Sequence, residues 1–125
     1  MKLGGVRRQL GESRAALVEA IEAAKRGEFD PAYRAALKSR NLLFHATRGI
    51  AAARGEALPE MPAVGIAGGA LDDHAPALAA VDAALAVEDD AAEMPPHLQL
   101  AKSSYARFLG FLREELGKVL RASKP

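Results

Sequence analysis

Four stretches of this chain repeat apolar residues at intervals of three and four, and each is bounded on at least one side by glycine or proline. Such spacing lines apolar side chains along one face of an α-helix, while glycine ends helices and proline opens them. The 28 alanines favour the same structure, because alanine is the best helix former and its small side chain lets helices pack closely. The sequence therefore predicts helices over residues 6–26, 31–54, 75–87 and 96–121.

The first two of these helices are expected to form an antiparallel hairpin. Gly27 supplies the stop of the first helix. Asp30 is predicted to be the N-cap of the second helix and Pro31 its first helical residue, and the helix should end before Gly55. Because only about three residues separate the two helices, they should lie side by side in opposite directions.

Residues 56–73 contain several prolines and glycines and are predicted to be a long irregular loop. The third helix is entered through Asp73 and Pro76 and ends at the acidic run 88–90. The expected fold is a single all-α domain over residues 1–125, an up-and-down four-helix bundle with that irregular loop between helices two and three.

The closing helix carries the clearest apolar stripe. Gly110 and Gly117, seven residues apart, mark a face where another helix could approach closely. The predicted core stripe consists of Ala101, Tyr105, Phe108, Leu112, Leu116 and Val119, widened by Leu109 and Leu120, with Phe111 beyond it.

Charge divides the chain into three blocks. Residues 1–54 carry eleven basic and five acidic side chains, residues 55–101 carry nine acidic and no Lys or Arg, and residues 102–125 carry six basic and two acidic side chains. Blocks of this kind either neutralise each other within the fold or present opposite charges to partners.

The composition also limits the class of protein. There is no cysteine, so disulfides and thiolate metal sites are excluded, and a reducing cytoplasm is the expected location. No apolar run approaches the length that a membrane helix needs. The first residues reach Arg7 and Arg8 without an apolar segment, which does not fit a signal peptide.

The second helix holds the candidate binding residues. Between Asp30 and Glu56 it contains no acidic side chain, and most of its circumference is apolar. At about 100° per residue, one stripe faces solvent, the acidic block or a nucleic acid. The residues of this stripe are Arg34, Lys38, Asn41, His45 and Arg48.

Arg40 and His45 are the candidate catalytic residues. A histidine as general base and an arginine that stabilises developing negative charge would suit metal-independent RNA cleavage through the 2′-hydroxyl. Five residues of one helix place the two side chains about 140° apart, so convergence would need a dimer. Asn41, about 40° from His45, is the nearer neighbour on the helix.

The other polar motifs are weak. His74 and His97 lie beside helix-opening prolines without a metal-ligand spacing. The glycine-rich stretch 65–69 lacks the Lys-Ser/Thr ending of a phosphate loop. No metal, no cofactor and no Ser/His/Asp or Cys/His nucleophile set is expected.

The order of features resembles HEPN domains, small helical bundles often paired with bacterial nucleotidyltransferases. The likeness covers about residues 15–120: a hairpin closed by the stretch 25–30, then Phe44-His45-Ala46 in the second helix. That helix ends with the stretch 51–55, and after an irregular segment the closing helix contains Ala101, Tyr105, Ala106, Phe108 and Leu109. One HEPN branch has a packing motif with two aromatic residues where this chain has Arg40-Asn41.

The ribonuclease branch of HEPN carries an arginine, four to six residues and then a histidine, and Arg40 to His45 matches that string. In that branch the pair belongs near the start of the last long helix, whereas here it lies in the second. The alignment over residues 15–120, in which Phe44-His45-Ala46 belongs to the second helix, explains more of the chain than the Arg–His match does. It implies a helical module without catalysis.

Three functions follow as hypotheses. The first is a non-catalytic interaction module that binds a nucleotidyltransferase-like protein or a nucleotide, within a toxin–antitoxin pair. The second is a toxin-like ribonuclease that uses Arg40 and His45 across a dimer. The third is a structural homodimer joined through the glycine-bearing face of the closing helix. Backbone-driven RNA binding without cleavage stays open, and it requires Arg34, Lys38, Arg40 and Arg48 to be exposed.

Overall fold

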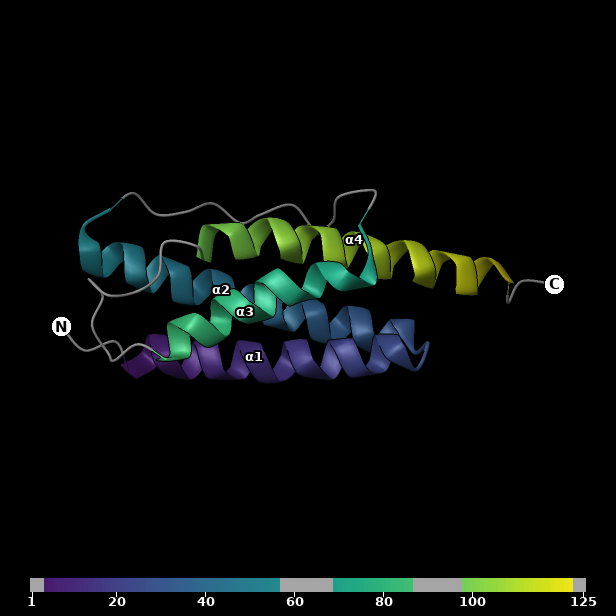
Figure 1. Ribbon diagram of the computed structural model, residues 1–125, viewed down its shortest axis with the longest axis horizontal. Helices are drawn as coiled ribbons and strands as arrows, with labels where there is room; N and C mark the ends of the chain where they lie inside the picture. The colour runs from purple at the N-terminus through teal and green to yellow at the C-terminus, as the bar shows by residue number, and fades with distance from the viewer. Residues whose placement is uncertain (1–3, 57–68, 87–97, 123–125) are drawn as a thin grey trace.

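A computed structural model describes residues 4–56, 69–86 and 98–122 of the chain (Figure 1). It confirms the predicted all-α four-helix bundle, and no strand occurs among these residues. In chain order the elements are α1 (Gly4–Lys25), α2 (Phe29–Arg54), a short 3-10 helix η1 (Leu71–Asp73), α3 (His74–Ala86) and α4 (Leu98–Ala122). None of the helices in the described part is both long and apolar enough to cross a membrane.

Two glycines end the first two helices, as predicted. Gly27 has φ +77° and Gly55 has φ +69°, the left-handed conformation that glycine adopts without strain. After α1, the N–H groups of Gly27 and Glu28 donate to the carbonyls of Ala24 and Ala23, at 3.0 and 2.9 Å. The same pair of bonds closes α2 at Gly55. Both ends are Schellman motifs, which satisfy the last helical carbonyls.

The predicted start of α2 is wrong. The helix begins at Phe29 with Glu28 as its N-cap, and no side chain caps it. Phe29 is partly buried and meets the Phe111 ring edge-on at 6.2 Å, so this tertiary contact draws the helix start forward. Asp30 lies in the first helical turn instead and its carboxylate accepts a hydrogen bond from Arg34 at 3.3 Å.

Two buried serines join α1 to α2. Ser13 Oγ donates to the Ser39 carbonyl at 2.8 Å, and Ser39 Oγ donates to the Ser13 carbonyl at 2.7 Å. The two hydroxyl oxygens are themselves 3.1 Å apart, and both residues are fully buried. Because each serine bonds the backbone of the opposite helix, the pair fixes the register of the antiparallel hairpin.

The helix directions are up, down, down, up, so the alternating order of the predicted up-and-down bundle is wrong at the step from α2 to α3. Arg14, midway along α1, pairs with Asp82 of α3, while the charge of Lys25 at the end of α1 acts on His74 at the start of α3. Helix α3 therefore runs antiparallel to α1 and in the same direction as α2, as Figure 1 shows. The end of α2 and the start of η1 accordingly lie at opposite ends of the bundle. A short turn could not join these two ends, whereas the residues between α2 and η1 are numerous enough to span the bundle.

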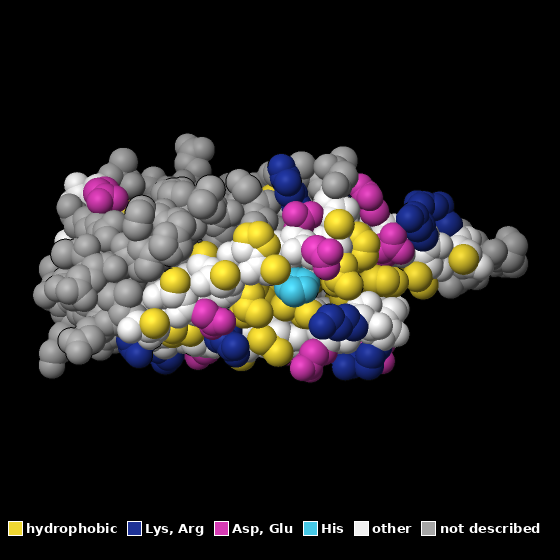
Figure 2. All heavy atoms as spheres, viewed as in Figure 1, with side chains coloured by type: hydrophobic (Ala, Val, Ile, Leu, Met, Phe, Trp, Pro, Cys, Tyr) yellow, Lys and Arg dark blue, Asp and Glu magenta, His cyan; other side chains and the backbone are white. Residues whose placement is uncertain are grey.

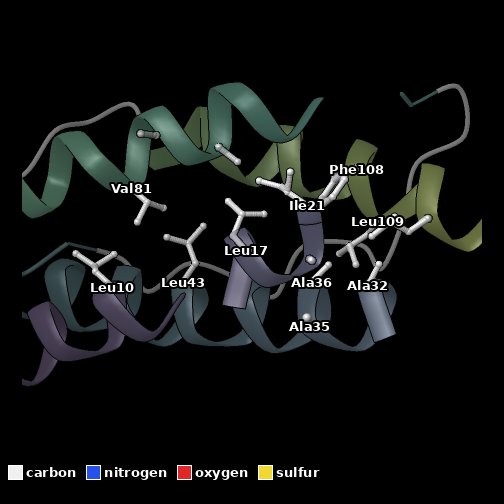
Figure 3. Close-up of a cluster of buried hydrophobic side chains, with 14 of the residues drawn as sticks. Leu10, Leu17, Ile21, Ala32, Ala35, Ala36, Leu43, Val81, Phe108 and Leu109 are labelled. Carbon is white, nitrogen blue, oxygen red and sulfur yellow. The ribbon is translucent and has the colours of Figure 1, made fainter. Parts of the chain in front are cut away.

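The core lies where all four helices meet (Figure 3). The predicted stripe of α4 is confirmed at Phe108, Leu109 and Leu112, none of which has exposed area. It is wrong at Val119 and Leu120, which are 47% and 56% exposed. The last turns of α4 extend past the ends of the neighbouring helices, so none of the other described helices covers them there (Figure 1). The side chains of Ala101 and Tyr105 lie outside the described residues.

The two glycines of α4 occupy different surroundings. Gly110 is buried within the bundle and Gly117 is half-buried near the exposed end of the helix. The face predicted to admit a further helix is therefore turned into the bundle at Gly110.

Candidate interaction surface on helix α2

The solvent face of α2 carries the predicted polar stripe, hereafter the α2 strip. It consists of Arg34, Lys38, Asn41, His45 and Arg48, and all five residues are exposed. The opposite face of the helix is buried and contributes Ala32, Ala36 and Leu43 to the core. The strip is therefore fixed on a helix that the core holds in place, rather than on a loop.

Two local contacts orient the ends of the strip. At the first end, Arg34 forms an ion pair with Asp30 one turn earlier. At the other end, the Arg48 guanidinium lies 5.6 Å from the centroid of the Phe44 ring, and the His45 ring lies 5.8 Å from it. Phe44 is only 8% exposed, so a fixed ring supports Arg48 through a cation–π contact.

Few carboxylates neutralise the strip. Within the described ranges, Asp30 is the one carboxylate that pairs with a strip residue. The acidic block is engaged elsewhere: Asp82 pairs with Arg14 of α1, and Asp73 accepts a hydrogen bond from the Ala70 N–H at 2.7 Å. Of the other acidic residues of the block, Glu56 and Asp72 are exposed, whereas Glu60, Glu88, Asp89, Asp90 and Glu93 lie outside the described residues.

The face formed by α3 and the second half of α4 looks different. Figure 2 shows hydrophobic side chains there, with acidic and basic groups interspersed among them. Mixed charges of this kind produce little net field. The α2 strip is distinguished by one sign of charge along one helix face.

The structure does not bring Arg40 and His45 together within one chain. Arg40 is 8% exposed and its Nη2 donates to Asn41 Oδ1 at 3.0 Å, whereas His45 is exposed on the strip. Of the four cations that RNA binding would require on the surface, Arg34, Lys38 and Arg48 are exposed and Arg40 is not.

His74 lies half-buried at the start of α3, with its ring edge-on to Phe108 at 5.9 Å. Burial, and secondly the charge of Lys25, lowers the pKa of His74 below its ordinary value of 6.5, although Asp72 acts in the opposite direction. In the described part of the chain, no three acidic or histidine side chains are placed to hold a metal ion. His97 lies outside the described residues.

Only the end of the glycine-rich stretch 65–69 is described. Gly69 packs directly on α4, where a Cβ atom would collide with the Arg107 backbone carbonyl. This glycine therefore serves a close backbone approach. Residues 65–68 lie outside the described residues.

The sequence reasoning missed the support that Phe44 gives to the strip. Phe44 and Arg48 are four residues apart on a helix, a spacing at which side chains meet, so their contact could have been predicted from the sequence. The Ser13–Ser39 pair gave no such signal, because its partners are 26 residues apart.

Comparisons with protein-family models, with curated proteins and with solved structures find no match for this chain.

Proposed function

We propose that this chain is a non-catalytic helical interaction module that binds a partner through the α2 strip. The observation that supports it most is the exposed run of cations on α2, which meets a single carboxylate among the described residues. Charges left exposed along one face favour association with a ligand of opposite sign, and they speed the encounter.

The HEPN resemblance suggests the class of partner. It favours a nucleotidyltransferase-like protein or a nucleotide, within a toxin–antitoxin pair. A nucleotide presents phosphates and a protein presents carboxylates, and both are bound by arginine through paired hydrogen bonds. The strip supports either ligand by the same chemistry.

Site-specific cross-linking tests this proposal. The chain has no cysteine, so Asn41→Cys creates one attachment point for a photoactivatable maleimide at the centre of the strip. Arg113→Cys, exposed on α4, is the matched control. We expect a discrete adduct in native-host extract from the strip position only.

Formation of that adduct should depend on the positive charge of the strip. Changing Arg34, Lys38 and Arg48 to glutamine in the Asn41→Cys background should abolish it. An adduct that survives these changes, or that forms equally from the α4 position, would refute the strip as the binding surface.

A second candidate is a structural homodimer joined through the end of α4. The exposure of Val119 and Leu120 beyond the bundle favours it, because apolar side chains on a projecting helix are suited to association. Sedimentation of the wild type and of a Val119→Ser/Leu120→Ser variant tests it. A monomeric wild type at micromolar concentration would exclude it.

No observation favours the ribonuclease that uses Arg40 and His45 across a dimer, and it stays a prediction. RNA cleavage measured beside Arg40→Ala and His45→Ala decides it. Cleavage that needs both side chains would replace the non-catalytic proposal.

A further inference from the structure

The α2 strip follows a line along its helix, which favours a ligand of matching shape, an inference that rests on the function proposed above. Its residues follow one another at intervals of four, three, four and three positions. This alternation is the heptad pattern by which one helix lies along another, with each contact residue meeting the partner helix. It keeps the strip on a line that drifts by only about 20° per heptad.

A helical partner matches this spacing over its whole length. From Arg34 to Arg48 the strip spans fifteen residues, and the fourteen steps between them rise about 21 Å at 1.5 Å per residue. A second helix with the same alternation presents contact residues about 5 Å apart on average, as the strip does. In an extended strand the side chains on one face lie about 6–7 Å apart, so they would fall out of register with the strip residues after a few positions.

The strip is less suited to single-stranded RNA. Proteins that bind single strands combine cations with exposed aromatic rings on which bases stack. The Phe and Tyr residues of α2 do not serve that purpose: Phe29 packs edge-on against Phe111, Phe44 is buried beneath Arg48, and Tyr33 is half-buried against the core. Cations without a stacking platform favour a ligand whose charge is carried by carboxylates.

We propose that the α2 strip receives an acidic helix of another protein, whose Asp and Glu side chains repeat at alternating intervals of three and four. Arg34, Lys38 and Arg48 would pair with these carboxylates. Asn41, neutral and central, fixes the register by hydrogen bonding a polar partner, as a single asparagine does in coiled coils.

The flanks of the strip suit the same partner. Leu37 and Leu42 are half-buried and, by helical phase, lie on opposite sides of the strip, each about 60–80° from its centre. A helix seated on the strip would cover part of both side chains. The interface would then combine charge pairs along the centre with apolar contact at its two edges.

Two synthetic peptides of identical composition test the proposal. In the first, about three heptads long, glutamates occupy positions spaced three and four apart. In the second the same glutamates are distributed around the helix, and circular dichroism confirms equal helicity. Fluorescence anisotropy at low salt should show binding of the first peptide at least about tenfold tighter than that of the second.

Variants of the protein locate the site. The triple change Arg34→Gln, Lys38→Gln and Arg48→Gln should abolish binding of the first peptide. Asn41→Asp, which places a negative charge at the centre of the strip, should weaken it. The matched control changes Arg113, Lys118 and Arg121 of α4 to glutamine and should leave binding unchanged. Far-ultraviolet dichroism and melting temperature verify that every variant is folded.

The outcomes separate this inference from the proposed function. Equal binding of both peptides, or tighter binding of single-stranded RNA than of the first peptide, would refute the acidic helix. The strip would remain the binding surface if the charge-dependent cross-link from Asn41→Cys is still formed. If the first peptide does not bind and that cross-link is also absent, both proposals are wrong.

Discussion

The hydrogen-bonded serines between α1 and α2 allow a prediction whose magnitude follows from the structure. Ser13 and Ser39 are fully buried, and each hydroxyl donates to the carbonyl of the other residue. Ser13→Ala removes one of these bonds and the contact between the two hydroxyls. A hydrogen bond contributes about 1 kcal/mol net to folding, while the better helix propensity of alanine returns up to about 0.5 kcal/mol.

Each single variant should therefore lower the free energy of unfolding by about 0.5–1 kcal/mol. The double variant Ser13→Ala/Ser39→Ala should cost less than the sum of the two. Each single variant loses its own bond to the backbone together with the contact between the two hydroxyls, whereas the double variant loses that shared contact only once.

Urea denaturation of the wild type, the two single variants and the double variant measures this coupling directly. Glu12→Ala, exposed on the same helix, is the control and should change stability by less than about 0.5 kcal/mol. If the two serine effects add without a coupling term, the hydroxyls do not act as a pair. A single variant as stable as the wild type would show that the lost bond contributes no more than the roughly 0.5 kcal/mol that the helix propensity of alanine returns.

Three further results are expected. Phe108→Ala removes a fully buried ring and should lower stability by about 3–5 kcal/mol in urea denaturation, whereas Leu120→Ala, at the exposed end of α4, should have little effect. Gly69→Ala should lower the melting temperature, because its Cβ would collide with the Arg107 carbonyl, and an unchanged melting temperature would refute that contact. Since the folded chain holds the pKa of His74 below 6.5, the unfolded chain binds the proton first, so stability should fall as pH drops below about 6.5. His74→Gln should remove that slope in melting curves taken across pH.

The sequence predicted those features of the fold that local chemistry determines. Gly27 and Gly55 end their helices because the backbone there adopts the left-handed conformation that glycine favours, so both helix ends can be predicted from the sequence. The α2 strip was found by helical phase alone, because its helix has one apolar and one charged face.

Features that depend on distant residues were not predictable. The start of α2 is set by the Phe29–Phe111 contact, which crosses most of the chain. Val119 has the right phase for the core, but its exposure depends on where the neighbouring helices end. Arg40 differs from these, because its burial follows from helical phase: it lies about 140° round the helix from the exposed His45.

The parallel course of α2 and α3 divides the bundle into two hairpins, α1 with α2 and α3 with α4, joined by a single covalent connection. Most pairing within each hairpin is close in sequence, which favours rapid folding of the halves before they dock. A nick in the connection between Glu56 and Gly69 would leave both hairpins intact. The protein would then become a two-chain complex, and its melting temperature would depend on concentration.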